Sequence, residues 1–572
     1  MIKLVSIEIE NFRSIENAAL RLPDKRPLVL FGANNAGKSN IIAAINRALG
    51  ERYAPNIEML DSDYFMRNKD RYPSSRITCH YNEPFYTDRY GNAYCDVCVS
   101  YNADPNLCQY EDVYGKKLFI SNSDRERIQA YLVDAERSIG YQLSYSSRYS
   151  LLSKFSHAVH DALGQQDKNL LSEAFEQIKM VFQSTPEFAQ FFSEFDKTVK
   201  NSVQGFVHGL EVDFSAYDPN NYAKSMKVFA KEGASVRAFD EFGTGEQQVL
   251  LMAFAKSYMQ VFGSESVILI LEEPEAHLHP LAQRWLKQYV YEMCESGIQI
   301  ILSTHSADFI DPSNIDGLVR VSKDEDGVTR CVQLSKLELR DQCIADGVDP
   351  CKVDELGVGE FYAARMMPDA LKGLFAKRVL LVEGPTEYFA LPVYFQRAGL
   401  SLAREGIEIV SCGGKGSIPS YYRLFNAFGI ECYCLFDADS ENRNNSELQS
   451  LLGIDAIQYC PDAFVADDKY AYFGKDFETT LRCEVAGYKD FEDEARKLYK
   501  VSGKPAIAKV AASTCGAIPT FICTLKDKLQ ASSFFVDDTS RPNELDEYGD
   551  YAPIDNGAAP SCEDQWDEDV PF

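Results

Sequence analysis

A glycine-rich loop that follows an apolar segment constrains the fold of this chain more than any other feature. Pro27–Phe31 has the apolar composition of a short buried strand. It leads into Gly-Ala-Asn-Asn-Ala-Gly-Lys-Ser at positions 32–39, which satisfies the pattern G-x-x-x-x-G-K-S in full. In this pattern Lys38 reaches the β- and γ-phosphates, Ser39 ligates Mg²⁺, and the helix expected over Asn40–Leu49 directs its positive N-terminus at the anion. The residues expected to contact ATP are Asn34, Asn35, Gly37, Lys38, Ser39 and Asn40.

Further motifs place this loop in a larger pattern. Asn-Phe-Arg-Ser at positions 11–14, followed by the loop, resembles the ABC ATPases of the RecF and SMC kind. After a long gap, Glu241–Gln248 contains Gly-x-Gly-Glu-Gln at the start of a helical run and is similar to the ABC signature. The resemblance implies that Gly243 and Gly245 bind the ATP of a facing subunit, so at least a dimer is expected. A simple helix-capping turn is the alternative interpretation.

Two more apolar runs end in residues suited to ATP hydrolysis. Val267–Leu271 ends in Glu-Glu-Pro-Glu, and Ile298–Leu302 ends in Ser-Thr-His-Ser. By the same resemblance Glu272 holds Mg²⁺ through water, Glu273 polarises the attacking water, and His305 contacts the γ-phosphate. Glutamate replaces the usual aspartate at Glu272, which departs from the common pattern.

A second set of acids follows two later apolar segments. Val379–Val382 leads to Glu383 and Glu387, and Cys432–Phe436 leads to Asp437 and Asp439. Residues at the carboxyl ends of parallel strands meet at one edge of a sheet. Because clustered carboxylates repel one another, we expect a divalent cation between them, Mg²⁺ or alternatively Mn²⁺. Two unrelated strand ends with solvated acids are the alternative.

This Glu…Asp-x-Asp arrangement resembles the Toprim fold of topoisomerases, primases and certain nucleases. Asp476 and Glu478 follow in Tyr-Phe-Gly-Lys-Asp-Phe-Glu at positions 472–478, and the whole series is similar to the overcoming-lysogenization-defect (OLD) nucleases. Those join an ABC ATPase to a Toprim domain and bind two metals. The resemblance implies a transition-state cation at Lys504, with Lys509 as the alternative. Lys415, after a glycine turn, is a further candidate for contacting a phosphate.

These motifs predict an α/β chain in which a P-loop ABC-type ATPase domain with a helical insertion precedes a Toprim, Rossmann-like domain. The expected division is an N-terminal ATPase part at 1–123, a helical insertion or dimerisation arm at 124–234, a C-terminal ATPase part at 235–335, a helical linker at 336–376, the Toprim nuclease domain at 377–530 and an acidic, disordered tail at 531–572. A DNA-contacting role for the arm is the alternative.

Composition limits the class of protein. There is no signal peptide and no run near the roughly 20 apolar residues that span a bilayer, so a cytoplasmic protein without membrane contact is expected. The net charge of −28 argues against a protein that simply coats DNA. DNA contact must then use local basic patches and bridging metal. Cys95-Asp96-Val97-Cys98 matches no closed zinc ligand set, which favours a hairpin with packed thiols.

The resulting functional hypothesis is an ATP-regulated, Mg²⁺-dependent DNA endonuclease or nickase that assembles as a homodimer or larger homo-oligomer. The resemblance to OLD nucleases implies an effector role in bacterial defence against phage and leaves open a partner protein from a defence system. The alternatives are a RecF-like or SMC-like repair ATPase whose C-terminal domain only binds DNA, and a topoisomerase or primase that shares the Toprim acids.

Overall fold

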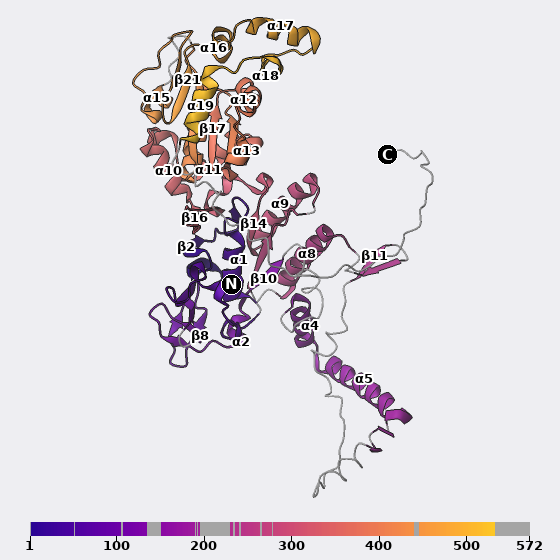
Figure 1. The fold of residues 1–572 in the computed structure, drawn as a ribbon. Helices are drawn as coiled ribbons and strands as arrows, with labels where there is room; N and C mark the ends of the chain where they lie inside the picture. The colour runs from indigo at the N-terminus through magenta and orange to yellow at the C-terminus, as the bar shows by residue number, and fades with distance from the viewer. Residues whose placement is uncertain are drawn as a thin grey trace, which may run out of the picture. The chain divides into compact units, whose positions relative to one another are not determined.

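A computed structural model gives the fold of most of this chain of 572 residues (Figure 1). It describes residues 2–50, 52–103, 107–133, 150–188, 190–191, 193–194, 229–232, 235–238, 242–262, 266–276, 278–439 and 446–531. Several regions interpreted from the sequence lie outside these residues. They are Glu241 at the start of the signature, two long stretches of the expected arm (134–149 and 195–228) and the acidic tail from residue 532.

A six-stranded, mainly parallel sheet carries the ATPase motifs, in the order β10-β13-β14-β3-β15-β16. The first five strands are parallel and β16 is antiparallel to β15. Strands β3 and β13 are buried along nearly their whole length, which is why they read as continuous apolar runs. The bounds are β3 Leu28–Phe31, β10 Ile128–Val133, β13 Ser266–Glu272, β14 Gln299–Thr304, β15 Leu318–Lys323 and β16 Thr329–Gln333.

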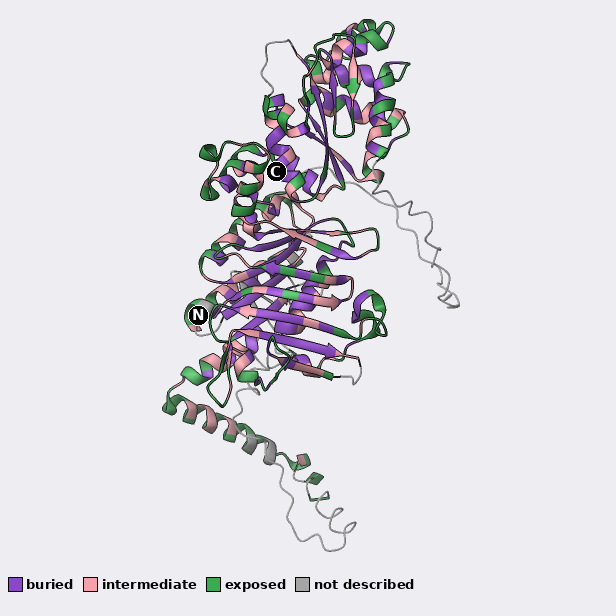
Figure 2. Ribbon diagram, turned by 90° about the vertical axis from the view of Figure 1, so that its left-hand side faces the viewer, coloured by how far each residue is buried: buried purple, intermediate pink, exposed green. Residues whose placement is uncertain are grey.

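An antiparallel six-stranded sheet, β2-β1-β4-β7-β8-β9, forms the second layer of the N-terminal region. In β2 the buried Ala18 and Leu20 alternate with the exposed Asn17, Ala19 and Arg21, as expected for a sheet with one solvated face; Figure 2 shows buried and exposed residues alternating along the strands. The bounds are β1 Leu4–Phe12, β2 Ile15–Arg21, β4 Ser74–Tyr81, β7 Asp96–Asn102, β8 Leu107–Glu111 and β9 Lys117–Leu118; a small hairpin joins β5 Tyr86–Thr87 to β6 Ala93–Tyr94. Cys98 is buried in this sheet, where it contacts Thr78 and Arg76.

The region expected to be a helical insertion contributes a strand to the ATPase sheet. Strand β10 pairs in parallel with β13, so Ile128–Val133 belongs to the sheet and not to an arm. The helices α4 (Leu151–Ala162) and α5 (Gln165–Gln183) follow. Phe155 of α4 packs edge-on against Phe254 and Phe262 of α8 (Thr244–Phe262), so α4 lies on the ATPase core. Helix α5 instead exposes apolar side chains, namely Leu170, Ile178, Met180 and Val181.

The segment between the ATPase and Toprim sheets is helical and packs into one core with both. It contains α10 (Lys336–Ala345), α11 (Glu355–Arg365) and the 3₁₀ segments η7 (Pro350–Lys352) and η8 (Pro368–Phe375). Phe31, the last residue of β3, makes edge-to-face contacts with Phe375 at 5.7 Å and Phe428 at 5.6 Å between ring centroids. The strand that enters the phosphate loop therefore ends against the Toprim region.

The C-terminal sheet has the order β18-β17-β19-β21-β20, with only β20 antiparallel to its neighbour. Its strands are β17 Arg378–Val382, β18 Ile407–Ser411, β19 Glu431–Asp437, β20 Phe464–Ala466 and β21 Tyr470–Phe473. A separate core that includes Leu380, Tyr394 and Phe473 lies between this sheet and α12, α18 and α19. The C-terminal helices are α12 Pro385–Arg397, α13 Leu402–Glu405, α14 Ile418–Ala427, α15 Ser446–Leu452, α16 Phe477–Glu484, α17 Tyr488–Leu498, α18 Lys504–Thr514 and α19 Thr520–Gln530.

The remaining helical elements belong to the N-terminal half. They are α1 Lys38–Leu49, α2 Asn122–Arg125, α8 Thr244–Phe262, α9 Pro280–Glu295 and the 3₁₀ turns at Ala54–Asn56, Asp61–Asp63, Phe65–Arg67, Ala307–Phe309 (η5) and Pro312–Gly317 (η6). A short ribbon pairs β11 (Phe229–Glu232) with β12 (Ser235–Ala238). None of the helices in the described ranges has the length and apolar character to cross a membrane.

The aromatic contact between Phe31 and Phe428 generates a stability prediction. Phe428 is fully buried, and removing a buried phenylalanine side chain lowers the free energy of unfolding by about 3–5 kcal/mol. We expect Phe428→Ala to shift the urea midpoint strongly downward. Phe119, which is 76% exposed, provides the control. A shift for Phe428→Ala no larger than that for Phe119→Ala would show that this junction does not stabilise the fold.

Candidate functional site

The phosphate loop, the Glu272–Glu275 segment and His305 lie at one edge of the ATPase sheet. They follow β3, β13 and β14, which are parallel neighbours, so their carboxyl ends coincide. Gly37 has φ 113°, and a Cβ there would meet Thr329 Oγ1 at 2.1 Å. The backbone conformation of the loop, and with it the direction of its N–H groups, therefore requires glycine at this position. The geometry is that of an anion cradle at the start of α1.

Lys38 occupies the centre of this cradle. Its ammonium donates to the carbonyl oxygens of Gly32 and Ala33, each at 3.0 Å, and lies 3.5 Å from His305 Nδ1. Burial lowers the pKa of Lys38 to about 8, while Glu273, Glu275 and Glu272 act in the opposite direction. The oxygens of a bound polyphosphate would take the place of these carbonyl oxygens as partners of the Lys38 ammonium.

The acids after β13 divide into different roles. Glu273 has φ 46°, and its Oε1 lies 3.1 Å from His305 Nε2. Glu275 Oε1 accepts hydrogen bonds from Thr304 Oγ1 and from the backbone N–H of His305, both at 2.7 Å. Glu275 therefore holds the loop that carries the histidine, a role that the sequence interpretation did not assign. The string Glu-Glu-Pro-Glu at positions 272–275 was the sequence signal from which this role could have been inferred.

The other residues expected at the nucleotide lie as follows. Asn34, Asn35 and Ser39 are exposed along the loop. Asn40 turns away, since its Nδ2 donates to Ser14 Oγ at 2.7 Å. Gly243 lies before α8 and donates its N–H to Glu246 Oε2 at 3.2 Å, a capping contact. A Cβ on Gly245 would meet Leu278 Cδ2 at 2.3 Å, so the close packing of Leu278 is by itself a reason for glycine at this position.

A second group of functional side chains lies at the carboxyl edge of the C-terminal sheet. Glu383 follows β17, and its Oε2 accepts the backbone N–H of Asp437, the last residue of β19, at 3.3 Å. Glu387 lies in the first turn of α12 and accepts the N–H of Gly384 at 3.2 Å. Asp437 Oδ1 is buried and has no hydrogen-bond partner within the described ranges. The strand topology thus brings together the acids that the sequence predicted to meet.

Mutual repulsion and burial perturb these carboxyl groups strongly. Burial, reinforced by Glu387, Glu383, Glu478 and Asp476, raises the pKa of Asp437 to about 9. Burial also raises the pKa of Glu387 to about 7, with Glu478 and Glu383 adding to it. The pKa of Glu383 is raised by burial as well. Such shifts are expected where several acids share a partly dry site without a cation.

The later acids approach the same place from other elements. Asp476 caps α16 by accepting the N–H of Thr479 at 2.7 Å. Glu478, in the first turn of that helix, lies 3.5 Å from the ammonium of Lys504, which is 77% exposed. Lys509 Nζ instead lies 5.8 Å from the centre of the Phe389 ring. Of the two lysine candidates, only Lys504 is paired with an acid of this cluster.

Asp439 and Lys415 form a pair of their own. Lys415 Nζ lies 2.8 Å from Asp439 Oδ2 and also donates to the carbonyl oxygen of Asp437. Lys415 is buried, so it faces the acids and not an open phosphate path. Asp439 has φ 57°, which ends the extended strand geometry before this residue.

The residues present fit a hard divalent cation. The donor set of Glu383, Glu387 and Asp437 is all carboxylate oxygen, the ligand type of Mg²⁺ and Mn²⁺, and a buried Asp437 oxygen lacks a partner. Within the residues that the structure describes, no three acid, His or Cys side chains are drawn together tightly enough to chelate an ion. Since the like charges repel, a cation is needed to bring these oxygens closer.

Comparison with known families matches both regions. Residues 374–439 match the Toprim domain of overcoming lysogenization defect protein-like proteins, and residues 2–112 and 100–310 match an AAA ATPase domain. The chain belongs to the OLD family. In this OLD-family chain, an AAA ATPase domain of the ABC kind precedes a Toprim domain, as the order of motifs predicted.

Three similar proteins extend along most of the chain. The OLD nuclease of Thermus scotoductus is 28% identical over 474 residues, 78% of this chain and 86% of the relative. The Old nuclease of Escherichia phage P2 is 26% identical over 77% of both chains. Endonuclease GajA of Bacillus cereus is 22% identical over 79% of this chain and 78% of the relative. Among solved structures, the Smc head domain from Pyrococcus furiosus superposes with a TM-score of 0.38 at 16% identity, over 60% of this chain and 99% of that one.

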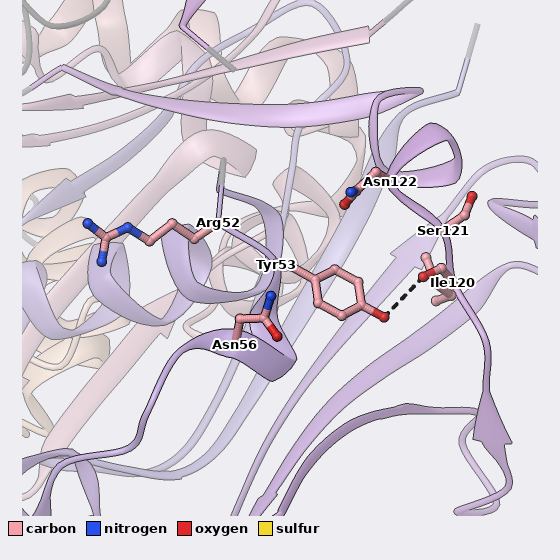
Figure 3. Close-up of a pocket in the computed structure, with 6 residues that line it drawn as sticks. All are labelled: Arg52, Tyr53, Asn56, Ile120, Ser121 and Asn122. Carbon is pink, nitrogen blue, oxygen red and sulfur yellow. Dashed lines mark hydrogen bonds between the residues drawn. The ribbon is translucent and has the colours of Figure 1, made fainter. Parts of the chain in front are cut away.

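A separate cavity in the N-terminal region is lined by six residues, Arg52, Tyr53, Asn56, Ile120, Ser121 and Asn122 (Figure 3). The Tyr53 hydroxyl donates to the carbonyl oxygen of Ile120 at 3.1 Å across it. It contains none of the residues of the phosphate loop or of the carboxylate cluster. This OLD-family chain therefore has its candidate chemistry at the two sheet edges.

The raised pKa of Asp437 generates a pH prediction for the metal-free protein. The folded state retains a proton between the ordinary pKa of 3.8 and about 9, while the unfolded state releases it. This contribution to stability is complete below the ordinary pKa and is lost as the pH rises through the folded value. We expect the melting temperature of wild type to fall relative to Asp437→Asn as pH rises from about 6 to about 9. A constant difference across this range would contradict the buried, protonated carboxyl.

Proposed function

We propose that this chain is an ATP-binding and ATP-hydrolysing, divalent-metal-dependent DNA endonuclease of the OLD type, producing nicks. The observation that carries the proposal is the buried Asp437 carboxylate, which lies beside Glu383 and Glu387 with one oxygen unpartnered. Support comes also from the relatives, two of which are named OLD nucleases and one an endonuclease. DNA is the substrate that these names suggest.

At the ATPase edge the proposal assigns each step to a side chain. Lys38 holds the β- and γ-phosphates, and Ser39 is the ligand for the accompanying Mg²⁺. Glu273 is the base that would orient the attacking water, and its Oε1 lies 3.1 Å from His305 Nε2, so the two side chains would act together on a bound nucleotide. The Glu275 carboxylate fixes the position of His305 by accepting a hydrogen bond from the backbone N–H of His305.

At the Toprim edge Glu383, Glu387 and Asp437 would hold the metal. When bound, a divalent ion there stabilises charge on the attacking and leaving oxygens of a phosphodiester. Glu383 accepts a backbone N–H and is placed to receive a proton from water. Lys504, exposed beside Glu478, supplies positive charge to the phosphate. Asp476 and Glu478 add negative charge near Asp437.

Plasmid nicking tests the nuclease assignment. With Mg²⁺ or Mn²⁺, we expect wild type to convert supercoiled plasmid to the nicked form and Asp437→Asn to lose at least about 100-fold in rate, since removal of one ligand group disables the site. ATP hydrolysis should be retained. Asp468→Asn, at an exposed strand end paired with Lys528, is the matched control. Metal-independent cutting, or full cutting by Asp437→Asn, would refute the assignment.

The same assay distinguishes the alternative, a repair ATPase whose Toprim region only binds DNA, because such a protein would bind the plasmid without nicking it. A topoisomerase would change linking number without leaving nicks, and a primase would polymerise nucleotides. The implied role in defence against phage is a prediction that plaque counts on expressing and non-expressing cells would check.

The hairpin of β15 and β16 favours nucleotide control of cutting. One side of it supports the phosphate loop, where Thr329 Oγ1 donates to Ala36 O at 3.2 Å. From its other side, Arg320 donates to the carbonyl oxygens of Phe428 and Gly429, at 3.2 and 3.1 Å, and to that of Ala376. A rearrangement of the phosphate loop on ATP binding would therefore be transmitted directly to the Toprim region.

Arg320→Met tests this coupling. The variant keeps an apolar stem and loses the three carbonyl contacts, so we expect nicking and ATP hydrolysis each to persist while the effect of ATP on the nicking rate falls to within about twofold. Arg330→Met, on the same hairpin but paired with Asp324 near the surface, is the matched control. An unchanged ATP effect in Arg320→Met would exclude the hairpin as the route.

Self-association is a further part of the proposal. Gly243 lies just before α8 and Gly245 in its first turn, and by the resemblance of this segment to the ABC signature both would meet the nucleotide of a facing copy. Helix α5 exposes Leu170 and Val181, at 58% and 68% of their surface. Exposed apolar side chains on one helix favour contact with another chain. A homodimer or larger homo-oligomer is therefore expected.

A further inference from the structure

The carboxylate cluster contains a cation of its own. Lys415 is 6% exposed, and its ammonium is 2.8 Å from Asp439 Oδ2 and bonded to the carbonyl oxygen of Asp437. A buried lysine is stable only when paired and hydrogen-bonded, and this pair meets that condition. The Asp439 side of the cluster is therefore already neutralised by the protein itself.

Local backbone structure fixes Lys415 in this place. Gly413 and Gly414 have φ values of 73° and 134°, which turn the chain after β18 back toward the acids. The N–H of Gly414 donates to the carbonyl oxygen of Glu383 at 2.7 Å. From α11, Arg365 Nη2 donates to Gly416 O and to Ser417 Oγ, both at 3.2 Å. The loop that carries the lysine is thus tied to β17 on one side and to α11 on the other.

The two aspartates of Asp-x-Asp have different surroundings. In an extended strand, residues two apart project from the same face. Here β19 ends at Asp437, and Asp439 is in the left-handed region at φ 57°, with its N–H bonded to Lys475 O at 3.2 Å. Asp437 keeps a buried, unpartnered oxygen among the described residues, whereas the Asp439 carboxylate is engaged by Lys415.

We propose that the Lys415 ammonium takes the place of a divalent cation at Asp439, so that Asp439 is not a metal ligand of this centre. The metal is held by Glu383, Glu387 and Asp437, together with the acids of α16. Asp439 and Lys415 act as positioning residues, because their pair fixes the end of β19 that presents Asp437. This inference rests on the proposed metal site and narrows its ligand set.

Direct binding of Mn²⁺ to the full-length, nucleotide-free protein tests the inference, with free Mn²⁺ followed by electron paramagnetic resonance. We expect Asp439→Asn to bind the same number of Mn²⁺ ions per chain as wild type, with affinity within about threefold, whereas loss of a true ligand at Asp437→Asn weakens binding by more than about tenfold. Both variants are isosteric amides, so each is the matched control for the other.

Lys415→Met gives an independent measurement. It removes the ammonium that pairs with Asp439 Oδ2 and keeps the apolar stem. We expect this variant to bind one more Mn²⁺ ion per chain than wild type, and the extra ion to be absent from the Lys415→Met, Asp439→Asn double variant. Melting temperatures confirm that each variant is folded.

The outcomes separate the two proposals. A folded Asp439→Asn protein that binds fewer Mn²⁺ ions, or binds them more than about tenfold more weakly, would overturn the inference and leave the metal site standing. The same holds if Lys415→Met is folded and gains no ion. A wild-type protein that binds no Mn²⁺ would overturn the proposed metal site and the inference together.

Discussion

The coincidence of parallel strand ends determines where both chemical sites of this chain lie. In each sheet the connections return to the same edge, so the residue after one strand meets the residue after the next. Phe31 at the end of β3 is followed by the phosphate loop, Glu272 at the end of β13 by further acids, and Thr304 at the end of β14 by His305. Val382 and Asp437 repeat the arrangement in the Toprim sheet. The residues that directly follow these strands therefore take their positions from the register of buried apolar strands.

Charge is the second constraint, and the two edges satisfy it in different ways. At the ATPase edge a lysine lies among carbonyl oxygens, ready for an anion. At the Toprim edge the acids exceed the nearby positive charge, and burial together with the neighbouring acids raises the pKa of Asp437 to about 9. The like charges of such a site repel one another, a strain that the proposed divalent ion would relieve on binding. Lys415 relieves the strain only on the side of Asp439.

The motifs predicted the fold and most of the site because their residues are contiguous. G-x-x-x-x-G-K-S needs only a strand before it and a helix after it. The contacts that sequence reasoning missed join residues far apart along the chain, such as Thr329 beneath Gly37 or Arg320 against Phe428. That β10 belongs to the ATPase sheet was missed for the same reason, since only its pairing with β13 shows it.

Asp439 illustrates a different limit of sequence reasoning. The period of two along a strand places both acids of Asp-x-Asp on one face, provided that the strand continues. Here the strand ends after the first acid, and a positive φ turns the second toward Lys415. Lysine after a glycine turn predicts a phosphate contact equally well, because the sequence does not show which side of the turn is buried. The same residues thus support either assignment until the backbone is known.

The junction at Phe31 links these constraints across the molecule. Its ring contacts Phe375 and Phe428, while its carboxyl side begins the phosphate loop. Close-packed interiors transmit a displacement because they have no free volume to absorb it. A movement of the phosphate loop must therefore repack this aromatic contact or carry the Toprim region with it. Arg320 favours the second course, since breaking its contacts would leave a partly buried guanidinium without its carbonyl partners.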